Sequence, residues 1–231
     1  MCAQDKLQDT SQQPLKTTLK RFCIVVVFGI AFAYIEAAVV VYLRTIFHPS
    51  DFTFPLSEFG ISPLWRQLLL TEMGREAATL VLIFISSWLF GRNLQQRFAF
   101  FLTIFAVWDI FYYVWLKILI NWPCSIMDWD ILFLIPTAWA GPILAPVIIS
   151  LTLLIFAVII LYRSSLARPI RPTLAGWFAF VLAALVVVAS FCAAGLHITE
   201  PDFQSHFYWP LFAAGYISAA ILFLKCLLKS K

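Results

Sequence analysis

Eight side chains with acidic, basic or phenolic groups lie inside long apolar segments of this chain. They are Glu36, Glu72, Arg75, Glu76, Asp109, Tyr112, Tyr113 and Lys117. An unpaired charge at the centre of a bilayer costs about 2.5–3.5 kcal/mol, so charged groups inside a membrane face one another or water. Intramembrane residues of this kind mark proton relays, ion pathways and polar-substrate sites. The sequence therefore predicts a polar chamber inside a helical bundle, formed by its first three apolar segments and biased toward the outer face.

Three of these residues share one face of the second apolar segment. Glu72, Arg75 and Glu76 are three and four residues apart, the spacing at which side chains are neighbours on a helix. Two carboxylates this close repel each other when both are ionised, and Arg75 offsets one of the two charges. If the chain is an enzyme, Glu72 and Glu76 are the predicted acid–base pair, with Arg75 holding an anionic head group.

The third apolar segment repeats polar groups every four residues. Asp109, Tyr113 and Lys117 follow this spacing, and Tyr112 is adjacent. Asp109 lies near the middle of its segment and is therefore the most costly charge to bury. Lys117 lies closer to the outer end, where a lysine can extend its ammonium group to the interface. For Lys117, an interfacial anchor is a full alternative to a functional role.

In the first apolar segment, Glu36 adjoins a stripe of small residues. Gly29, Ala33 and Ala37 repeat at helical spacing and allow close helix packing, which directs Glu36 toward the bundle. Arg44 follows two turns later and can reach back toward the predicted chamber.

The chamber has more acids than bases. Glu36, Glu72, Glu76 and Asp109 face Arg75 and Lys117, so two acids remain unbalanced. Protons, a cation, or Arg44 and Arg66 at the rim can supply the balance. The structural alternative is a buried ion-pair network that fixes how the helices pack.

The elements that must position these residues are membrane-spanning helices. The chain has 231 residues, of which 62% are hydrophobic and 12% charged, against about 25% charged in soluble domains. Apolar runs of about 20 residues are long enough to cross a bilayer. We therefore predict an all-α integral membrane protein with six transmembrane helices. The six runs are Phe22–Leu43, Leu64–Phe90, Phe98–Ile120, Ile131–Tyr162, Thr173–Gly195 and Trp209–Leu228.

The fourth run is too long for one simple span. Ile131–Tyr162 would extend about 48 Å as a helix at 1.5 Å per residue, compared with a hydrocarbon core of about 30 Å. Pro136 and Pro142 interrupt its first half, and proline breaks or kinks a helix. We expect a Pro-broken or re-entrant segment over Ile131–Ala140, followed by a span over about 142–162. The alternative is one continuous, kinked and tilted helix.

Lysine and arginine distribution predicts the orientation. Lysine occurs in the N-terminal region and at the C-terminus, and arginine in the N-terminal region and in the second-to-third and fourth-to-fifth connections. The positive-inside rule then places both termini in the cytoplasm, most simply across a bacterial inner membrane. Residues 1–21 are predicted as a flexible cytoplasmic tail, 22–228 as a single six-span domain, and 229–231 as a cytoplasmic C-terminus.

Motifs for cofactor chemistry are missing from the sequence. It has no Walker loop, dinucleotide fingerprint or helix-borne metal motif, so no cofactor and no metal site are predicted. His197, Glu200, Asp202 and His206 share an outer loop, where such residues are more often solvated than metal-binding. Cys124 and Cys192 both fall near outer span ends, and two unconnected thiols are favoured over a disulfide. The net charge of +4 is no nucleic-acid signal in a membrane protein.

Three functional classes remain. The first is a transporter-like protein that handles protons, a cation or a small polar solute. The second is a structural or assembly subunit of a membrane complex, and the third an intramembrane enzyme acting on a lipid or lipid-linked substrate. The expected partners are the lipid bilayer and a proton, cation or small polar ligand, and association into a homo- or hetero-oligomer is compatible with all three classes. A transporter needs a wet path or two access states, whereas an enzyme needs a lateral opening to lipid beside its carboxylates.

Overall fold

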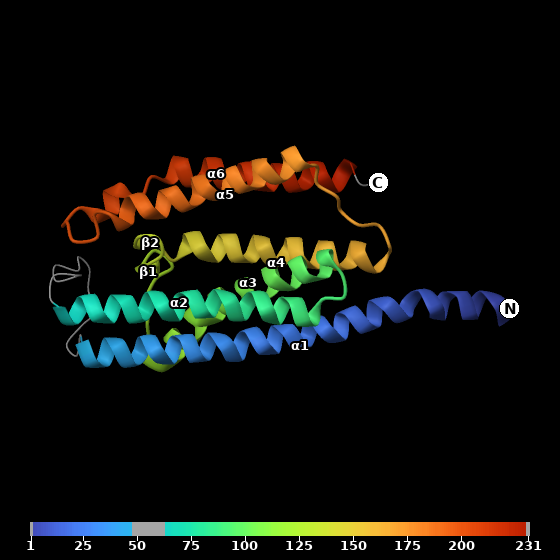
Figure 1. Ribbon diagram of the computed structural model, residues 1–231, viewed down its shortest axis with the longest axis horizontal. Helices are drawn as coiled ribbons and strands as arrows, with labels where there is room; N and C mark the ends of the chain where they lie inside the picture. The colour runs from blue at the N-terminus through green and yellow to red at the C-terminus, as the bar shows by residue number, and fades with distance from the viewer. Residues whose placement is uncertain (1, 48–62, 230–231) are drawn as a thin grey trace.

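The computed structural model describes residues 2–47 and 63–229 and is mostly helical, at 78%. Six α-helices, one two-stranded hairpin and one short 3₁₀ helix follow one another along the described chain (Figure 1). Their bounds are α1 Cys2–Phe47, α2 Pro63–Phe90, α3 Leu94–Ile120, β1 Trp129–Phe133, β2 Trp139–Pro142, α4 Leu144–Ser165, α5 Leu174–Gly195, η1 Phe203–His206 and α6 Trp209–Lys229.

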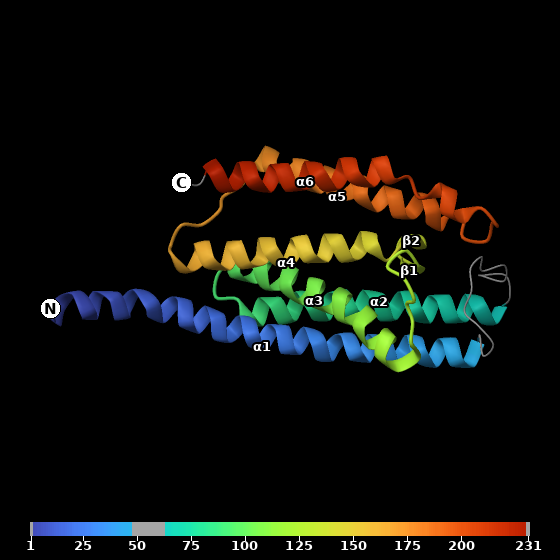
Figure 2. The ribbon, with the colours of Figure 1, turned by 180° about the vertical axis from the view of Figure 1, so that it is seen from behind.

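The helices form two layers of unequal size. Helix α3 packs against α1, α2 and α4, and together these four helices make the main bundle. Helices α5 and α6 pack against each other and lie beside α4 as a separate pair in both views (Figures 1 and 2). The hairpin β1–β2 lies at one end of the bundle, where β2 contacts α5. The hairpin therefore connects the two layers at that end.

Five of the helical segments are long and apolar enough to cross a membrane. These segments are Leu15–Ile46, Leu94–Ile120, Leu144–Ser165, Leu174–Gly195 and Phe203–Lys229. Helix α2 has 28 residues, but it contains Arg66, Glu72, Arg75 and Glu76 and is not among the five. The membrane-like helical character predicted from the sequence is confirmed, and a sixth crossing by α2 stays a prediction.

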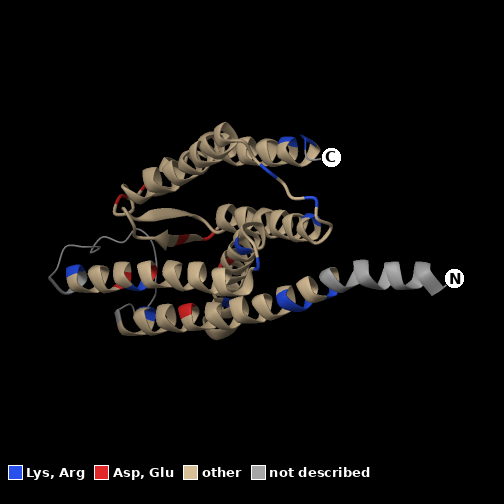
Figure 3. Cartoon of the chain, turned by 45° about the vertical axis from the view of Figure 1, so that its right-hand side comes forward, with Lys and Arg blue, Asp and Glu red and all other residues tan. Residues whose placement is uncertain are grey.

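Charged side chains are unevenly distributed over the two ends of the bundle. Lysine and arginine gather on the connection between α4 and α5, near the C-terminus and on the early part of α1 (Figure 3). Most acidic side chains lie in the other half of the molecule, on α1, α2 and the hairpin (Figure 3). This pattern agrees with the charge asymmetry from which the orientation is predicted.

The predicted break in the fourth apolar run is confirmed, and the alternative of one continuous kinked helix over Ile131–Tyr162 is wrong. Strand β1 pairs antiparallel with β2, with Trp129 opposite Pro142 and an irregularity in the ladder between Ile131 and Phe133. Helix α4 begins only at Leu144. Proline cannot continue a helix without losing a backbone hydrogen bond, and the chain meets this constraint by forming a hairpin. Whether the hairpin is re-entrant stays a prediction.

The hairpin lies directly against the end of α5. A Cβ atom added at Gly195 would lie 1.7 Å from the carbonyl oxygen of Ala138. No side chain fits at such a separation, so glycine is required for the close approach of the two backbones. Gly195 thus sets how deeply the hairpin sits between the layers.

The small-residue stripe on α1 packs as the sequence predicts. Ala33 and Ala37 are fully buried, and a Cβ at Gly29 would meet the side chain of Val107 on α3 at 2.9 Å. This close helix–helix packing turns the adjacent Glu36 toward the bundle interior, where its side chain is 13% exposed.

At the N-terminus, α1 begins at Cys2, within the region predicted as a flexible tail over residues 1–21. That tail and the other domain limits stay predictions. Cys124 and Cys192 are both free in the described structure.

Candidate functional site

A small polar cavity of about 60 Å³ lies where α1, α2, α3 and β1 meet. Six of the eight residues predicted for the chamber line it, and the structure brings them together from three helices. The cavity is lined by Glu36, Val40, Arg75, Glu76, Thr79, Trp108, Asp109, Tyr112, Tyr113, Ile131, Leu132 and Phe133. Strand β1 supplies the last three of these residues, so the hairpin forms one wall of the cavity.

Arg75 connects the acids of α1 and α2. Its Nε and Nη2 atoms lie 2.8 and 2.7 Å from Oε2 of Glu72, one helical turn earlier, and its Nη1 atom pairs with Glu36 on α1. All three side chains are between 12% and 24% exposed. A guanidinium group has five donors in a fixed plane and can therefore bind two carboxylates at once.

Glu76 has a different partner from Glu72. Both of its carboxylate oxygens accept from the backbone N–H of Leu134, at 3.1 and 2.9 Å. Leu134 lies in the turn of the hairpin, directly after β1, so this contact joins α2 to the hairpin. Glu72 and Glu76 therefore engage separate groups, and the structure does not present them as a convergent acid–base pair.

Asp109 accepts a hydrogen bond from the hydroxyl group of Ser150 on α4, at 2.8 Å. Ser150 is 1% exposed and was not identified from the sequence. It lies inside a strongly apolar helix, where a single serine gives little sequence signal. This contact places α4 next to the acid cluster, which the sequence assigned to the first three spans.

Asp130 is a further acid of the site that sequence analysis missed. It is 3% exposed and lies 3.4 Å from Nη2 of Arg44, whose guanidinium group stacks on Trp122 at 3.8 Å. Burial raises the pKa of Asp130 to about 6, although the charge of Arg44, the Ile131 N–H and the hydroxyls of Tyr112 and Tyr113 act to lower it.

The sequence did contain a signal for Asp130. This aspartate interrupts an apolar run, with Trp129 before it and Ile131, Leu132 and Phe133 after it. An acid inside such a run is costly unless it is paired. Its partner Arg44 was predicted to reach back toward the chamber, and the ion pair with Asp130 agrees with that prediction.

One buried polar group on the cavity wall, Nε1 of Trp108, has no hydrogen-bond partner among the described residues, and Trp108 is 7% exposed. Buried polar groups in native proteins are nearly always hydrogen-bonded to protein or to ordered water. The cavity therefore presents a hydrogen-bond donor that suits a water molecule or a small polar ligand.

Lys117 lies outside the cavity. Its Nζ atom donates to the carbonyl oxygens of Asn121 and Pro123, at 3.3 and 3.0 Å, and its side chain is exposed. These contacts cap the end of α3, which corresponds to the anchoring alternative for this residue. The basic partners of the cluster are thus Arg75 and Arg44.

The described cluster has a clear excess of acid. Arg75 and Arg44 are the two guanidinium groups paired with it. Its five carboxyl groups belong to Glu36, Glu72, Glu76, Asp109 and Asp130. Because unpaired buried charges are costly, this excess calls for protons or a bound cation.

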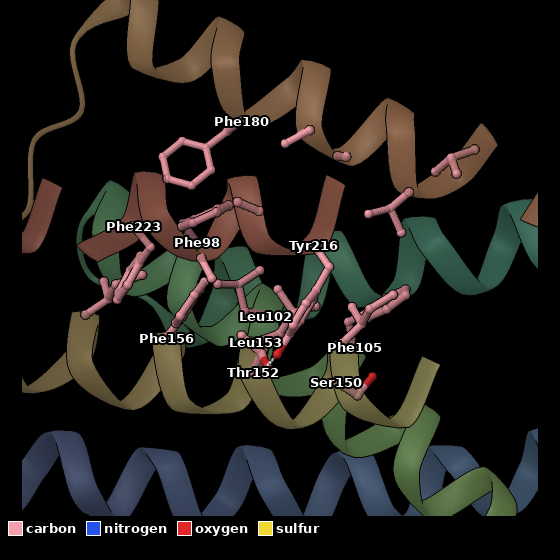
Figure 4. A pocket seen from close by; sticks show the side chains of 18 of the residues that line it. Phe98, Leu102, Phe105, Ser150, Thr152, Leu153, Phe156, Phe180, Tyr216 and Phe223 are labelled. Carbon is pink, nitrogen blue, oxygen red and sulfur yellow. Dashed lines mark hydrogen bonds between the residues drawn. The ribbon is translucent and has the colours of Figure 1, made fainter. Parts of the chain in front are cut away.

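A second, larger cavity of about 680 Å³ lies between the main bundle and the α5–α6 pair. Its walls are mainly apolar, and Figure 4 shows the rings of Phe98, Phe156, Phe180 and Phe223 around it. On its wall, the hydroxyls of Thr152 on α4 and Tyr216 on α6 lie 2.7 Å apart (Figure 4). Asp109 lines both cavities and therefore lies in the wall between them.

No protein-family model, curated protein sequence or solved structure matches this chain. One cavity is small and lined by acidic groups, and the other is larger and mainly apolar.

Proposed function

We propose that the acid cluster around the small cavity takes up and releases protons, and that the chain is a transporter-like, proton-handling membrane protein. The observation that carries the proposal is the excess of carboxyl groups in the cluster beside a cavity of about 60 Å³. Protons neutralise an excess of carboxylates without occupying additional volume in the cavity. Acidic chains of this kind inside membrane proteins serve as proton relays.

The size of the cavity favours protons over a polar organic solute. Pockets for small organic molecules measure about 300–1,000 Å³, whereas about 60 Å³ accommodates one or two water molecules. The unpartnered N–H of Trp108 can donate to water but repels a bare cation. A water-assisted proton site therefore agrees with the lining better than a solute or a dehydrated metal ion does.

Asp109 is the carboxyl group on which the proposal depends most. It accepts from the neutral hydroxyl of Ser150, whereas Glu36 and Glu72 are paired with Arg75. A carboxyl group without a cationic partner is held in a low-dielectric site most cheaply when it carries a proton. Its place between the two cavities makes it the natural exchange point.

The test is proton flux into liposomes that contain the full chain and a trapped pH-sensitive dye. We expect the wild type to transmit protons above the level of empty liposomes under an imposed pH gradient. Asp109→Asn should abolish this flux, because an amide cannot ionise. Infrared difference spectra over a pH titration should show a protonated carboxyl band that Asp109→Asn removes.

Asp202→Asn is the matched control, because Asp202 is a carboxylate with a 72% exposed side chain outside the cluster. It should leave both the flux and the carboxyl band unchanged. The proposal fails if the wild type shows no flux above empty liposomes, or if Asp109→Asn transmits protons as the wild type does.

A second candidate function is an activity on lipid or lipid-linked substrates. It is favoured by the 680 Å³ apolar cavity, whose size is that of a small-molecule site and whose wall includes Asp109. In this case Asp109 would be the acid–base group in place of Glu72 and Glu76, and the hydrocarbon chain would lie among the phenylalanine rings of Figure 4.

This candidate is tested by binding of a spin-labelled stearic acid to the full chain in detergent. Ala219→Phe, which narrows the apolar cavity, should reduce the immobilised fraction of the label. Ala214→Phe, an exposed position on the same helix, is the control. Equal immobilisation in both variants would reject binding in this cavity.

We also propose six spans, with α2 as the second, and both termini in the cytoplasm of a bacterial inner membrane. The lysine and arginine distribution supports this orientation. A reporter fused after residue 126 should then be active only outside the cytoplasm, and cytoplasmic activity at this position would reverse the orientation.

A further inference from the structure

The connection between α5 and α6 brings together two of the three histidines in the chain. His197 and His206 stack with ring centroids 3.7 Å apart and an angle of 11° between their planes. Glu200 lies between them along the chain and contacts both. This arrangement lies outside the main bundle and far along the chain from the acid cluster.

The three side chains converge on a small volume. Oε1 of Glu200 lies 2.9 Å from Nδ1 of His197, and Oε2 lies 3.7 Å from Nε2 of His206. One ligand atom from each residue lies within 4.8 Å of the others. Around tetrahedral Zn²⁺, with bonds of about 2.0–2.1 Å, ligand atoms are about 3.3 Å apart. The separations of Glu200 from His197 and from His206, 2.9 and 3.7 Å, lie on either side of that value.

The backbone that carries these residues is well anchored. The N–H of His197 donates to Ala194 at 3.1 Å, and that of Glu200 donates to His197 at 2.9 Å. Phe203 is buried and packs edge-on against Trp129 of β1 at 4.8 Å. Because the backbone is fixed, the side chains need only rotate to change partners.

We propose that His197, Glu200 and His206 form a binding site for a divalent transition metal, with Zn²⁺ as the best match. Imidazole nitrogen and carboxylate oxygen are ligands that Zn²⁺ accepts, and two histidines with one glutamate leave a fourth position for water. On binding, the two rings turn out of their stack so that their nitrogens point to one ion. The ion then joins the end of α5 to the start of α6.

The chemistry of the donor set distinguishes this site from an ordinary acidic loop. Calcium and magnesium prefer oxygen ligands, whereas two imidazoles favour zinc, nickel or copper. Asp202, 4.0 Å from His206 and largely exposed, lies at the margin of the site and is not needed for it. The proposal is independent of proton handling by the buried acids.

The test is calorimetric titration of ZnCl₂ into the full chain in detergent after removal of metals with a chelator. We expect one zinc ion per chain and, with Co²⁺ as a spectroscopic probe, the visible absorption of a tetrahedral site. His206→Ala and Glu200→Gln should each weaken binding by at least about 10–100-fold, the effect seen even for groups outside the ligand set. Affinity should also fall at acidic pH, because imidazole must be neutral to bind.

Two controls separate this site from nonspecific binding. Gln204→Ala alters an exposed neighbour in the same connection, and His48→Ala removes the third histidine, which lies outside the described residues. Both should bind zinc as the wild type does. The proposal is overturned if the wild type does not bind zinc, or if His206→Ala binds it with unchanged affinity. Loss of binding in His48→Ala would likewise reassign the site.

Discussion

The acid-rich bundle of α1–α4 and the apolar pair α5–α6 are packed by different kinds of contact. In the bundle, buried charges pair across α1, α2 and the hairpin, beside a cavity of about 60 Å³. In the pair, no Asp, Glu, Lys or Arg occurs in Leu174–Gly195 or in Trp209–Leu224. Packing there includes aromatic contacts such as that between Phe191 on α5 and Phe212 on α6, whose ring centroids are 5.9 Å apart. The small cavity thus lies where polar side chains from several elements meet, whereas the large cavity lies where the pair faces the bundle mainly through apolar side chains.

The hairpin takes part in both halves. Its first strand carries Asp130 to Arg44, its turn carries the N–H of Leu134 to Glu76, and its second strand contacts α5. The comparison between the two halves can therefore be tested by substitutions on either side of the hairpin and within it.

The largest effect is expected at Arg75. Arg75→Met leaves Glu36 and Glu72 without their shared partner, and breaking a buried ion pair in this way costs about 3–5 kcal/mol. The measurement is reversible unfolding in mixed detergent. Arg66→Met on the same helix is the control, because Arg66 is exposed, and surface changes stay within about ±0.5 kcal/mol. Equal effects would mean that the cluster contributes no specific stability.

A pH-dependent effect is expected at Asp130. Its pKa is about 6 in the folded chain against an ordinary value of 3.8, mainly because of burial. Between about pH 4 and 6 the unfolded chain loses this proton first, so the free energy of unfolding falls as pH rises, by about 3 kcal/mol in total. Asp130→Asn should remove this slope. The unfolding free energies of the wild type and Asp130→Asn are measured from pH 4 to 8. A difference between the two proteins that does not change with pH would contradict the prediction.

A smaller effect is expected where the hairpin meets the apolar pair. Gly195→Ala forces a Cβ against the carbonyl oxygen of Ala138, so backbones must separate at a cost of about 1–3 kcal/mol. Gly74→Ala is its matched control, since a Cβ there meets nothing within 4 Å. That change should stabilise α2 by up to about 0.5–1 kcal/mol. The change in unfolding free energy should therefore be negative for Gly195→Ala and positive for Gly74→Ala. Changes of the same sign would argue against close packing of the hairpin on α5.

The smallest effect is expected across the apolar cavity. Thr152→Val removes its hydrogen bond to Tyr216, which should cost about 0.5–1.5 kcal/mol. Tyr216→Phe should cost a similar amount, and the double variant little more than either alone. A double-mutant cycle measures this coupling. Fully additive losses would show that the two hydroxyls do not act as a pair.

Much of the site was predictable because burying charge is costly. Glu36, Arg75, Glu76 and Asp109 were identified from their position in apolar segments, and all four line the same cavity. Lys117 is also a charged residue in an apolar segment, but it lies outside the small cavity. Its long side chain near a helix end reaches polar backbone groups instead. Sequence position alone does not distinguish these two outcomes.

The amino-acid sequence by itself determined the helical, membrane-like character of the chain, the break before the fourth apolar helix and the acid-rich set of side chains. These follow from local properties: hydrophobic length, proline, and the cost of burying charge. Only the tertiary structure decided the partners of each charge. The hairpin brings Asp130 and the Leu134 N–H to α1 and α2, and α4 brings Ser150 to Asp109. Such contacts join residues 41 to 86 positions apart, and no local pattern specifies them.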